Sequence, residues 1–266
     1  MTELRTPLEI ALLDEDLAGV NARLEAGDTP HSLNHLGIPA LYDALRRNNL
    51  TVLDRLDEAG TDWSTPYNLG GFTPLIYASL HCDIKTVRWL VERGQDVCQR
   101  TQRGIGVMHV SAQREGEEIA RYLYQQGADP FRETDHGETP LLISLKAKKG
   151  LSVFTFLLDC YVEASTDLTP LLLPCVARIF DKQQSEGVQS LEALLRCVEV
   201  EALPSEKEIR GYLEQPGHFS SSPFRTLYKT LSTRMSHTLF ALLKSARISR
   251  AFPAGGDSNW RGLGGL

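Results

Sequence analysis

The sequence predicts an all-α solenoid of five to six helix-turn-helix repeats, followed by a helical C-terminal extension. Two rows of landmarks support this prediction. The first row is four glycines and a cysteine, spaced 33, 34, 33 and 33 residues apart: Gly27, Gly60, Gly94, Gly127 and Cys160. The second row is apolar and has the same spacing: Leu8, Leu41, Leu75, Met108 and Leu141. Because self-similarity at a fixed period of roughly 20 to 50 residues is the signature of repeat architectures, the two rows predict stacked units.

Each unit has the same predicted anatomy, which is clearest in the third. Thr73 is a favourable N-cap, and Pro74 suits the first helical position, where its missing N–H costs nothing. We expect a short helix over 75–80, a turn at 81–83, and a second, apolar-rich helix closed by Gly94 in the left-handed conformation. Neither helix buries its apolar face alone, so neighbouring units are expected to stack into one continuous core.

Several segments carry the motifs of a known family. They are Gly71-Phe72-Thr73-Pro74-Leu75, Glu92-Arg93-Gly94-Gln95-Asp96-Val97, Gln126-Gly127-Ala128-Asp129-Pro130 and Gly137-Glu138-Thr139-Pro140-Leu141. With these motifs, residues 4–164 resemble the ankyrin repeat family. The resemblance implies paired antiparallel helices, a protruding hairpin loop in each repeat, and protein binding as the usual role.

The sequence also departs from the family pattern, which has His after Thr-Pro-Leu. The equivalent residues here are Glu9, Tyr42, Ile76, His109 and Leu142. His109 matches, but its unit has Gly106-Val107 in place of Thr-Pro. We therefore expect the family's Thr-to-His hydrogen bonds to be absent from every repeat, His109 to be a half-buried helix residue, and the repeats to be held mainly by apolar packing.

The predicted domain organisation has three parts. Repeats occupy residues 1–200, in units at about 4–36, 37–69, 70–103, 104–136 and 137–164, with a degenerate sixth unit at 165–200. A helical capping extension follows at 201–252, with helices beginning near Ser205 and Ser222. Residues 253–266 contain five glycines and are expected to form a disordered tail.

Composition excludes several classes of protein. A chain that is 42% hydrophobic and 23% charged is expected to fold, and no apolar run approaches the roughly 18 residues of a membrane helix. We also expect no signal peptide, since the first residues are acidic. The five cysteines are scattered and never form Cys-x-x-Cys, which argues against disulfides or a zinc site and favours the cytoplasm, with the nucleus as an alternative.

The formal charge of −6 hides an acidic beginning and a basic end. Such a chain is not expected to bind nucleic acid in general. No Gly-x-Ser-x-Gly, His-Glu-x-x-His or phosphate-binding loop occurs, and Gly104-Ile105-Gly106 lacks the third glycine of a dinucleotide fingerprint. The histidines have no metal-ligand spacing. We expect no catalytic activity, no cofactor, no metal and no small-molecule substrate.

The candidate binding surface comes from equivalent positions after each short helix. These are Leu13-Asp14, Arg46-Arg47, Leu80-His81, Gln113-Arg114 and Lys146-Ala147. Stacking aligns them along a concave groove that begins acidic and becomes basic, and the loop residues Arg100, Arg103 and Arg132 extend it. The predicted contact residues are Arg46, Arg47, Phe72, Leu80, His81, Arg100, Arg103, Ile105, Gln113, Arg114 and Lys146. An ordinary solvated charged face is the alternative interpretation.

The favoured function is a non-catalytic protein-protein interaction module, a scaffold or adaptor, that binds an acidic or amphipathic protein segment through this groove and the hairpin loops. Three alternatives remain open. Residues 170–179 fit the loose elongin-binding box of SOCS-box proteins, which indicates a substrate adaptor of a cullin-type ubiquitin ligase, although Pro174 is awkward inside such a helix. The C-terminal extension could hold an unrecognised active site, or its basic helix could bind a membrane surface or nucleic acid instead of capping the solenoid.

Overall fold

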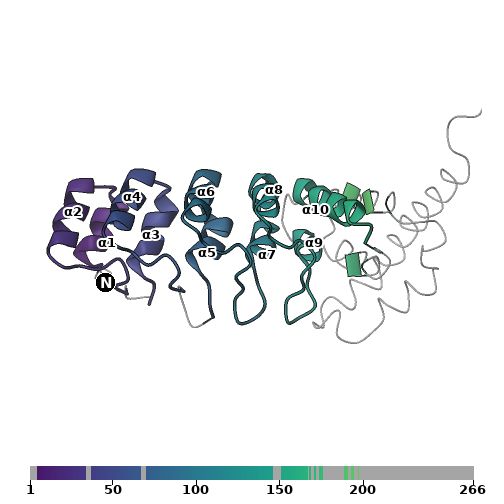
Figure 1. The fold of residues 1–266 in the computed structure, drawn as a ribbon, viewed down its shortest axis with the longest axis horizontal. Coiled ribbons are helices and arrows are strands. Elements are labelled where there is room, and N and C mark those ends of the chain that lie inside the picture. The colour runs from purple at the N-terminus through teal and green to yellow at the C-terminus, as the bar shows by residue number, and fades with distance from the viewer. Residues whose placement is uncertain are drawn as a thin grey trace, which may run out of the picture. The chain divides into compact units, whose positions relative to one another are not determined.

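The computed structural model describes residues 5–33, 37–66, 70–145 and 151–166, with isolated positions between 168 and 197. The chain divides into two units, residues 1–163 and 164–266. In the first unit the described helices form a single row of five pairs (Figure 1). The first helices of the pairs are α1 (Pro7–Leu13), α3 (Ala40–Arg47), α5 (Pro74–His81), α7 (Val107–Ser111) and α9 (Pro140–Ser144). The second helices are α2 (Leu17–Glu25), α4 (Leu50–Glu58), α6 (Ile84–Glu92), α8 (Glu118–Gln125) and α10 (Leu151–Glu163).

The first helices lie on the side of the row that carries the connecting loops, and the second helices lie on the opposite side (Figure 1). Within the described residues, β-type pairing is limited to two isolated antiparallel β-bridges, each at the base of a hairpin: Leu33 with Pro39 and Arg100 with Gly106. The all-α repeat solenoid predicted from the sequence is therefore confirmed.

Local capping explains where the first helices begin. The Thr73 hydroxyl accepts a hydrogen bond from the Ile76 N–H at 3.4 Å, and the Thr139 hydroxyl accepts one from the Leu142 N–H at 3.3 Å. Each threonine is followed by a proline at the first helical position. These contacts satisfy backbone donors that a helix start otherwise leaves unpaired, and α5 has the start and end predicted for it to within one residue.

The apolar landmarks form the core of the row. Their exposed fractions are 2% or less at every repeat: Leu8, Leu41, Leu75, Met108 and Leu141. Leu90 and Leu123, at equivalent places in α6 and α8, are fully buried. The register of the repeats is therefore the one that the 33-residue spacing predicts.

The glycine landmarks close the second helices. Gly27, Gly60, Gly94 and Gly127 all have φ between 79 and 94°, a conformation that costs glycine little because it has no Cβ. The fifth landmark differs, because Cys160 lies inside α10, which continues to Glu163. A residue with a Cβ adopts the left-handed conformation only at a cost, so the helix runs on past this position.

Two residues at the family's His position serve as caps. His109 is 2% exposed, so the prediction of a half-buried residue was wrong. Its Nδ1 accepts a hydrogen bond from the Gly106 N–H at 3.1 Å, so the third helical residue satisfies the backbone N–H of the N-cap, the reverse of the threonine hydrogen bond at α5 and α9. In the first repeat, the Glu9 carboxylate accepts from the Thr6 N–H while the Thr6 hydroxyl accepts from the Glu9 N–H, forming a capping box.

Polar and aromatic contacts add to apolar packing between the second helices. Trp63 and Trp89 pack edge to face with ring centroids 4.9 Å apart, and each indole N–H donates to a carboxylate of α4. Arg93 lies over the Trp89 ring at 3.8 Å and pairs with Asp54 at 2.7 Å and Asp57 at 2.8 Å. Adjacent repeats are therefore fixed to each other on the side away from the loops.

Several predicted elements cannot be compared with the structure. The degenerate sixth repeat at 165–200 is described only at isolated positions beyond residue 166, and the capping extension at 201–252 and the tail at 253–266 lie outside the described residues.

Candidate protein-binding groove

The predicted groove residues lie where the first helices end. Arg46 and Arg47 are the last residues of α3, Leu80 and His81 end α5, and Gln113 follows α7. Helix α5 packs against both α3 and α7, so these three ends are neighbours in space. Lys146, predicted to continue the row, lies outside the described residues.

His81 is exposed and lies near one cation from each neighbouring repeat, Arg46 and Arg114. Burial of the ring lowers the pKa of His81, and the positive charges of Arg114 and Arg46 lower it further. The imidazole also packs against Tyr77, with ring centroids 4.7 Å apart. His81 is therefore held neutral over more of the pH range than an ordinary histidine, and the lasting positive charge here comes from the arginines.

Asp43 of α3 is a half-buried acidic residue one helical turn before the groove arginines Arg46 and Arg47. Burial raises the pKa of the Asp43 carboxyl, and the nearby Glu9 carboxylate raises it too, while Arg46, Arg5 and Arg47 act in the opposite direction. One carboxylate oxygen of Asp43 is buried and has no hydrogen-bond partner among the described groups. Asp43 and Glu9 lie within α3 and α1 and not at the predicted groove positions, so the change from acidic to basic along the groove stays a prediction.

Two of the predicted arginines bind the protein's own backbone. The Arg100 guanidinium donates to the Gly104 carbonyl at 2.9 and 2.7 Å, and also to the Glu133 carbonyl in the next hairpin. Arg114 donates to the Leu80 carbonyl at 2.7 Å. Both residues therefore stabilise the stacking of repeats.

Neighbouring hairpins are also joined through their backbones. The Gln102 N–H donates to the Gly70 carbonyl at 3.0 Å, and the Asp135 N–H donates to the Arg103 carbonyl at 3.1 Å. Phe72 is half-buried, and its carbonyl accepts a hydrogen bond from the Tyr42 hydroxyl at 3.1 Å. The loops are consequently braced from one repeat to the next.

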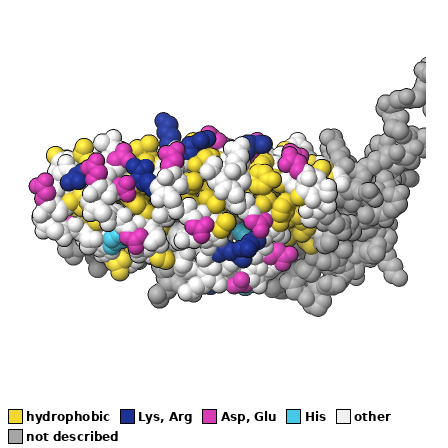
Figure 2. Space-filling view, in the orientation of Figure 1, with side chains coloured by type: hydrophobic (Ala, Val, Ile, Leu, Met, Phe, Trp, Pro, Cys, Tyr) yellow, Lys and Arg dark blue, Asp and Glu magenta, His cyan; other side chains and the backbone are white. Residues whose placement is uncertain are grey.

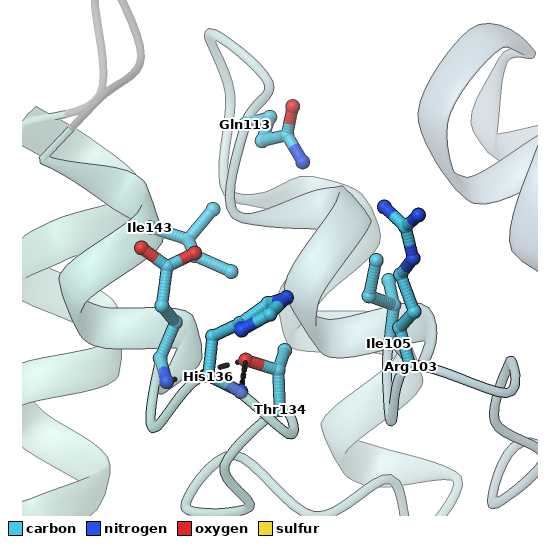
Figure 3. Close-up of a pocket in the computed structure, with 7 residues that line it drawn as sticks. Arg103, Ile105, Gln113, Thr134, His136 and Ile143 are labelled. Atoms are coloured by element: carbon cyan, nitrogen blue, oxygen red, sulfur yellow. Dashed lines mark hydrogen bonds between the residues drawn. The ribbon is translucent and has the colours of Figure 1, made fainter.

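A cavity of about 210 Å³ opens between the fourth and fifth repeats (Figure 3). Its lining residues are Arg103, Ile105, Gln113, Thr134, His136, Glu138 and Ile143. In Figure 3, Arg103 and Ile105 stand on one side, Ile143 on the other, and His136 between them. The Thr134 hydroxyl accepts from the His136 N–H at 3.3 Å and from the Glu138 N–H at 3.2 Å, which fixes the turn below the cavity.

Three of these lining residues are in the set predicted from the sequence, and four are not. Those missed are Thr134, His136, Glu138 and Ile143. The signal was present, because His136 and Glu138 lie 33 residues after Arg103 and Ile105, which is one repeat. Applying the repeat spacing to the hairpin positions as well as to the helix ends would have found them.

Arg103 differs from Arg100 and Arg114 in its contacts. Its side chain is exposed and makes no hydrogen bond or ion pair with any described residue. The face seen in Figure 2 carries charges of both signs, with hydrophobic side chains between them. In this view the positive charges therefore do not form a broad basic face. The exposed arginine that lines the cavity is Arg103.

Other kinds of site were also sought in the described ranges. No group of three or more His, Cys, Asp or Glu side chains there is placed to hold a metal ion. None of the helices in those ranges has both the length and the apolar character needed to cross a membrane.

Comparison with known proteins gives a family match and three relatives. Residues 41–91 match the family model described as ankyrin repeats, many copies. Protein phosphatase 1 regulatory subunit 27 of Mus musculus is 30% identical, and that of Homo sapiens 29%, each over 98 residues that make up 37% of this chain and 64% of the relative. An L-asparaginase of Dirofilaria immitis is 25% identical over 137 residues, which are 52% of this chain and 23% of that protein. The chain thus spans less than two thirds of the length of each of these relatives.

Proposed function

Since its helix pairs are ankyrin repeats, we propose that this chain is a non-catalytic protein-binding module that takes an acidic or amphipathic protein segment along the groove. The observation that carries the proposal is Arg103, which lines a cavity on the loop side of the row and whose exposed guanidinium has no partner among the described residues. A cation in this position is available to a partner, whereas Arg100 and Arg114 are bonded to carbonyls of their own chain.

The comparisons support a binding role over catalysis. The phosphatase subunits are named as regulatory, and ankyrin repeats imply protein-protein interaction. The match to L-asparaginase covers 23% of that enzyme's length. The ubiquitin-ligase adaptor and the C-terminal active site stay predictions, because the residues that they need lie outside the described ranges. A cytoplasmic or nuclear location stays a prediction as well.

The braced hairpins support a groove that binds without large rearrangement. Backbone hydrogen bonds join adjacent hairpins at Gln102 and at Asp135. A surface that is already ordered loses little conformational entropy on binding. Complementary charges then act mainly on encounter rate and specificity.

Charge reversal at two groove positions tests the proposal. We would use affinity capture with mass spectrometry to find partners of the wild type, then measure their association kinetics with Arg47→Glu, Arg103→Glu and the double variant. Folding should be preserved, since exposed charges contribute little to stability. Association should slow and lose much of its salt dependence. Arg114 is left unchanged because its hydrogen bond to Leu80 would confuse binding with stability.

Lys85→Glu is the matched control, because Lys85 is exposed on α6, on the other side of the row. This variant makes the same change in net charge as each single groove variant, but away from the groove, and should leave binding intact. A double groove variant that binds the captured partners with unaltered rate and salt response would show that the groove is an ordinary solvated face.

A further inference from the structure

The cavity between the fourth and fifth repeats has the features of a site for one side chain. We propose that it is an anchor subsite that receives an aliphatic side chain of the partner segment, while Arg103 binds a carboxylate next to that side chain. The inference rests on the proposed function and deepens it, since it specifies the chemistry of two neighbouring residues of the segment.

The volume of the cavity and its walls favour a side chain over a whole ligand. Pockets for small molecules and cofactors usually measure about 300–1,000 Å³, and this one measures about 210 Å³. Ile105 is half-buried and Ile143 is 6% exposed, so both offer apolar surface to the cavity. Binding interfaces commonly concentrate their energy in such an anchored side chain, surrounded by polar contacts.

The charges around the cavity determine which neighbour the aliphatic residue should have. Arg103 has no described partner for its guanidinium, which is suited to bidentate contact with a carboxylate. Glu138 and His136 are the other ionisable side chains of the lining, and the exposed Asp135 lies in the same hairpin, with its carboxylate close to Gly104. The acidic residue of the segment should therefore lie beside the Arg103 guanidinium and away from the Glu138 carboxylate, which would repel it.

The two walls are already fixed to each other. The Asp135 N–H donates to the Arg103 carbonyl at 3.1 Å, and Arg100 bridges to the carbonyl of Glu133. Gly104 has φ of 74° and lies where the hairpin that carries Arg100 and Arg103 meets the next hairpin. The cavity therefore exists before a partner arrives, and its formation takes little from the binding free energy.

A peptide selection tests the subsite with a defined probe. Short random linear peptides displayed on phage would be selected against the full chain, and the enriched peptides synthesised and their affinities measured. We expect the enriched peptides to share an aliphatic residue beside Asp or Glu. Arg103→Glu should weaken them roughly tenfold, which is about 1.4 kcal/mol, and changing the peptide's acid to Lys should restore affinity for that variant alone. Lys85→Glu should leave the affinity unchanged.

A second variant reports on the apolar part of the subsite. Ile105→Gln should weaken the same peptides, and its circular dichroism melt shows whether the fold is retained. Peptides that lose affinity with Arg47→Glu but not with Arg103→Glu would overturn the subsite and leave the groove proposal standing. Both proposals fail if no peptide is enriched, or if the enriched peptides bind Arg47→Glu and Arg103→Glu as tightly as they bind the wild type.

Discussion

The guanidinium of Arg114 donates a 2.7 Å hydrogen bond to the carbonyl oxygen of Leu80, one repeat earlier in the chain. Leu80 is the penultimate residue of α5, and the last carbonyls of a helix have no partner within the helix. A cation that the sequence assigns to partner binding therefore also caps a helix of the preceding repeat. This contact separates the groove arginines into those that hold the repeats together and those available to a ligand.

Loss of the Arg114 contact should destabilise the protein. Arg114→Ala removes a charged donor to a backbone carbonyl and should lower the free energy of unfolding by about 1 kcal/mol. Gln113→Ala, at the exposed neighbouring position, is the control and should change it little. Urea unfolding followed by circular dichroism measures both. Equal midpoints for the wild type and Arg114→Ala would mean that the contact contributes nothing in solution.

The fully buried leucines of the second helices should be costly to truncate. Leu90→Ala or Leu123→Ala should lower the free energy of unfolding by about 2–5 kcal/mol, through lost burial and the cavity left behind. Ile10→Ala, in which the side chain is 48% exposed, is the comparison and should cost far less. If the free energy of unfolding fell by less than about 1 kcal/mol in both leucine variants, the observed register of the repeats would be contradicted.

Two glycines with nearly the same φ should respond differently to alanine. Gly94 and Gly104 have φ of 79° and 74°, but a Cβ at Gly94 would meet nothing within 4 Å. At Gly104 it would come within 2.6 Å of Nη2 of Arg100 and 3.2 Å of the backbone nitrogen of Asp135. Gly94→Ala should therefore cost about 1–2 kcal/mol from the backbone alone, and Gly104→Ala should cost more.

The variants Gly94→Ala and Gly104→Ala also distinguish a local backbone effect from a loss of contacts between neighbouring hairpins. Gly104→Ala must displace Arg100 from the Gly104 and Glu133 carbonyls, so amide exchange in the 128–139 hairpin should quicken. Gly94→Ala should leave exchange there unchanged. Indistinguishable stability and exchange in the two variants would show that the hairpin contacts do not brace the row.

Protonation of His109 should destabilise the fold. Burial lowers the pKa of His109 below its ordinary value, and a proton on Nδ1 would remove the acceptor that the Gly106 N–H uses. The unfolded state then binds the proton more readily, so stability should fall as the pH drops below about 6.5, until the folded protein is protonated too. Urea unfolding across this range measures the effect. His109→Gln should show a weaker pH dependence, and an NMR titration that places the pKa of His109 at or above 6.5 would contradict the prediction.

The sequence by itself determined the repeat, its register and, in the third repeat, where the two helices begin and end. Thr73 with Pro74, and Gly94, each have a role that depends on residues within one or two turns of chain. The burial of Leu90 depends on stacking, which the repetition of the same apolar positions in every unit predicts. The same local reasoning failed at Cys160, where the spacing of the glycines suggested a helix end and the helix continued.

Only the tertiary structure decided which arginine is available. In sequence, Arg100, Arg103 and Arg114 are equivalent candidates for a basic groove. Their roles differ because carbonyls that lie about one repeat away in the chain, on Glu133 and Leu80, stand within reach of Arg100 and Arg114 and not of Arg103. The partner of a long, flexible side chain is set by the stacking of separate repeats, and that geometry is not encoded in the spacing of landmarks along the chain.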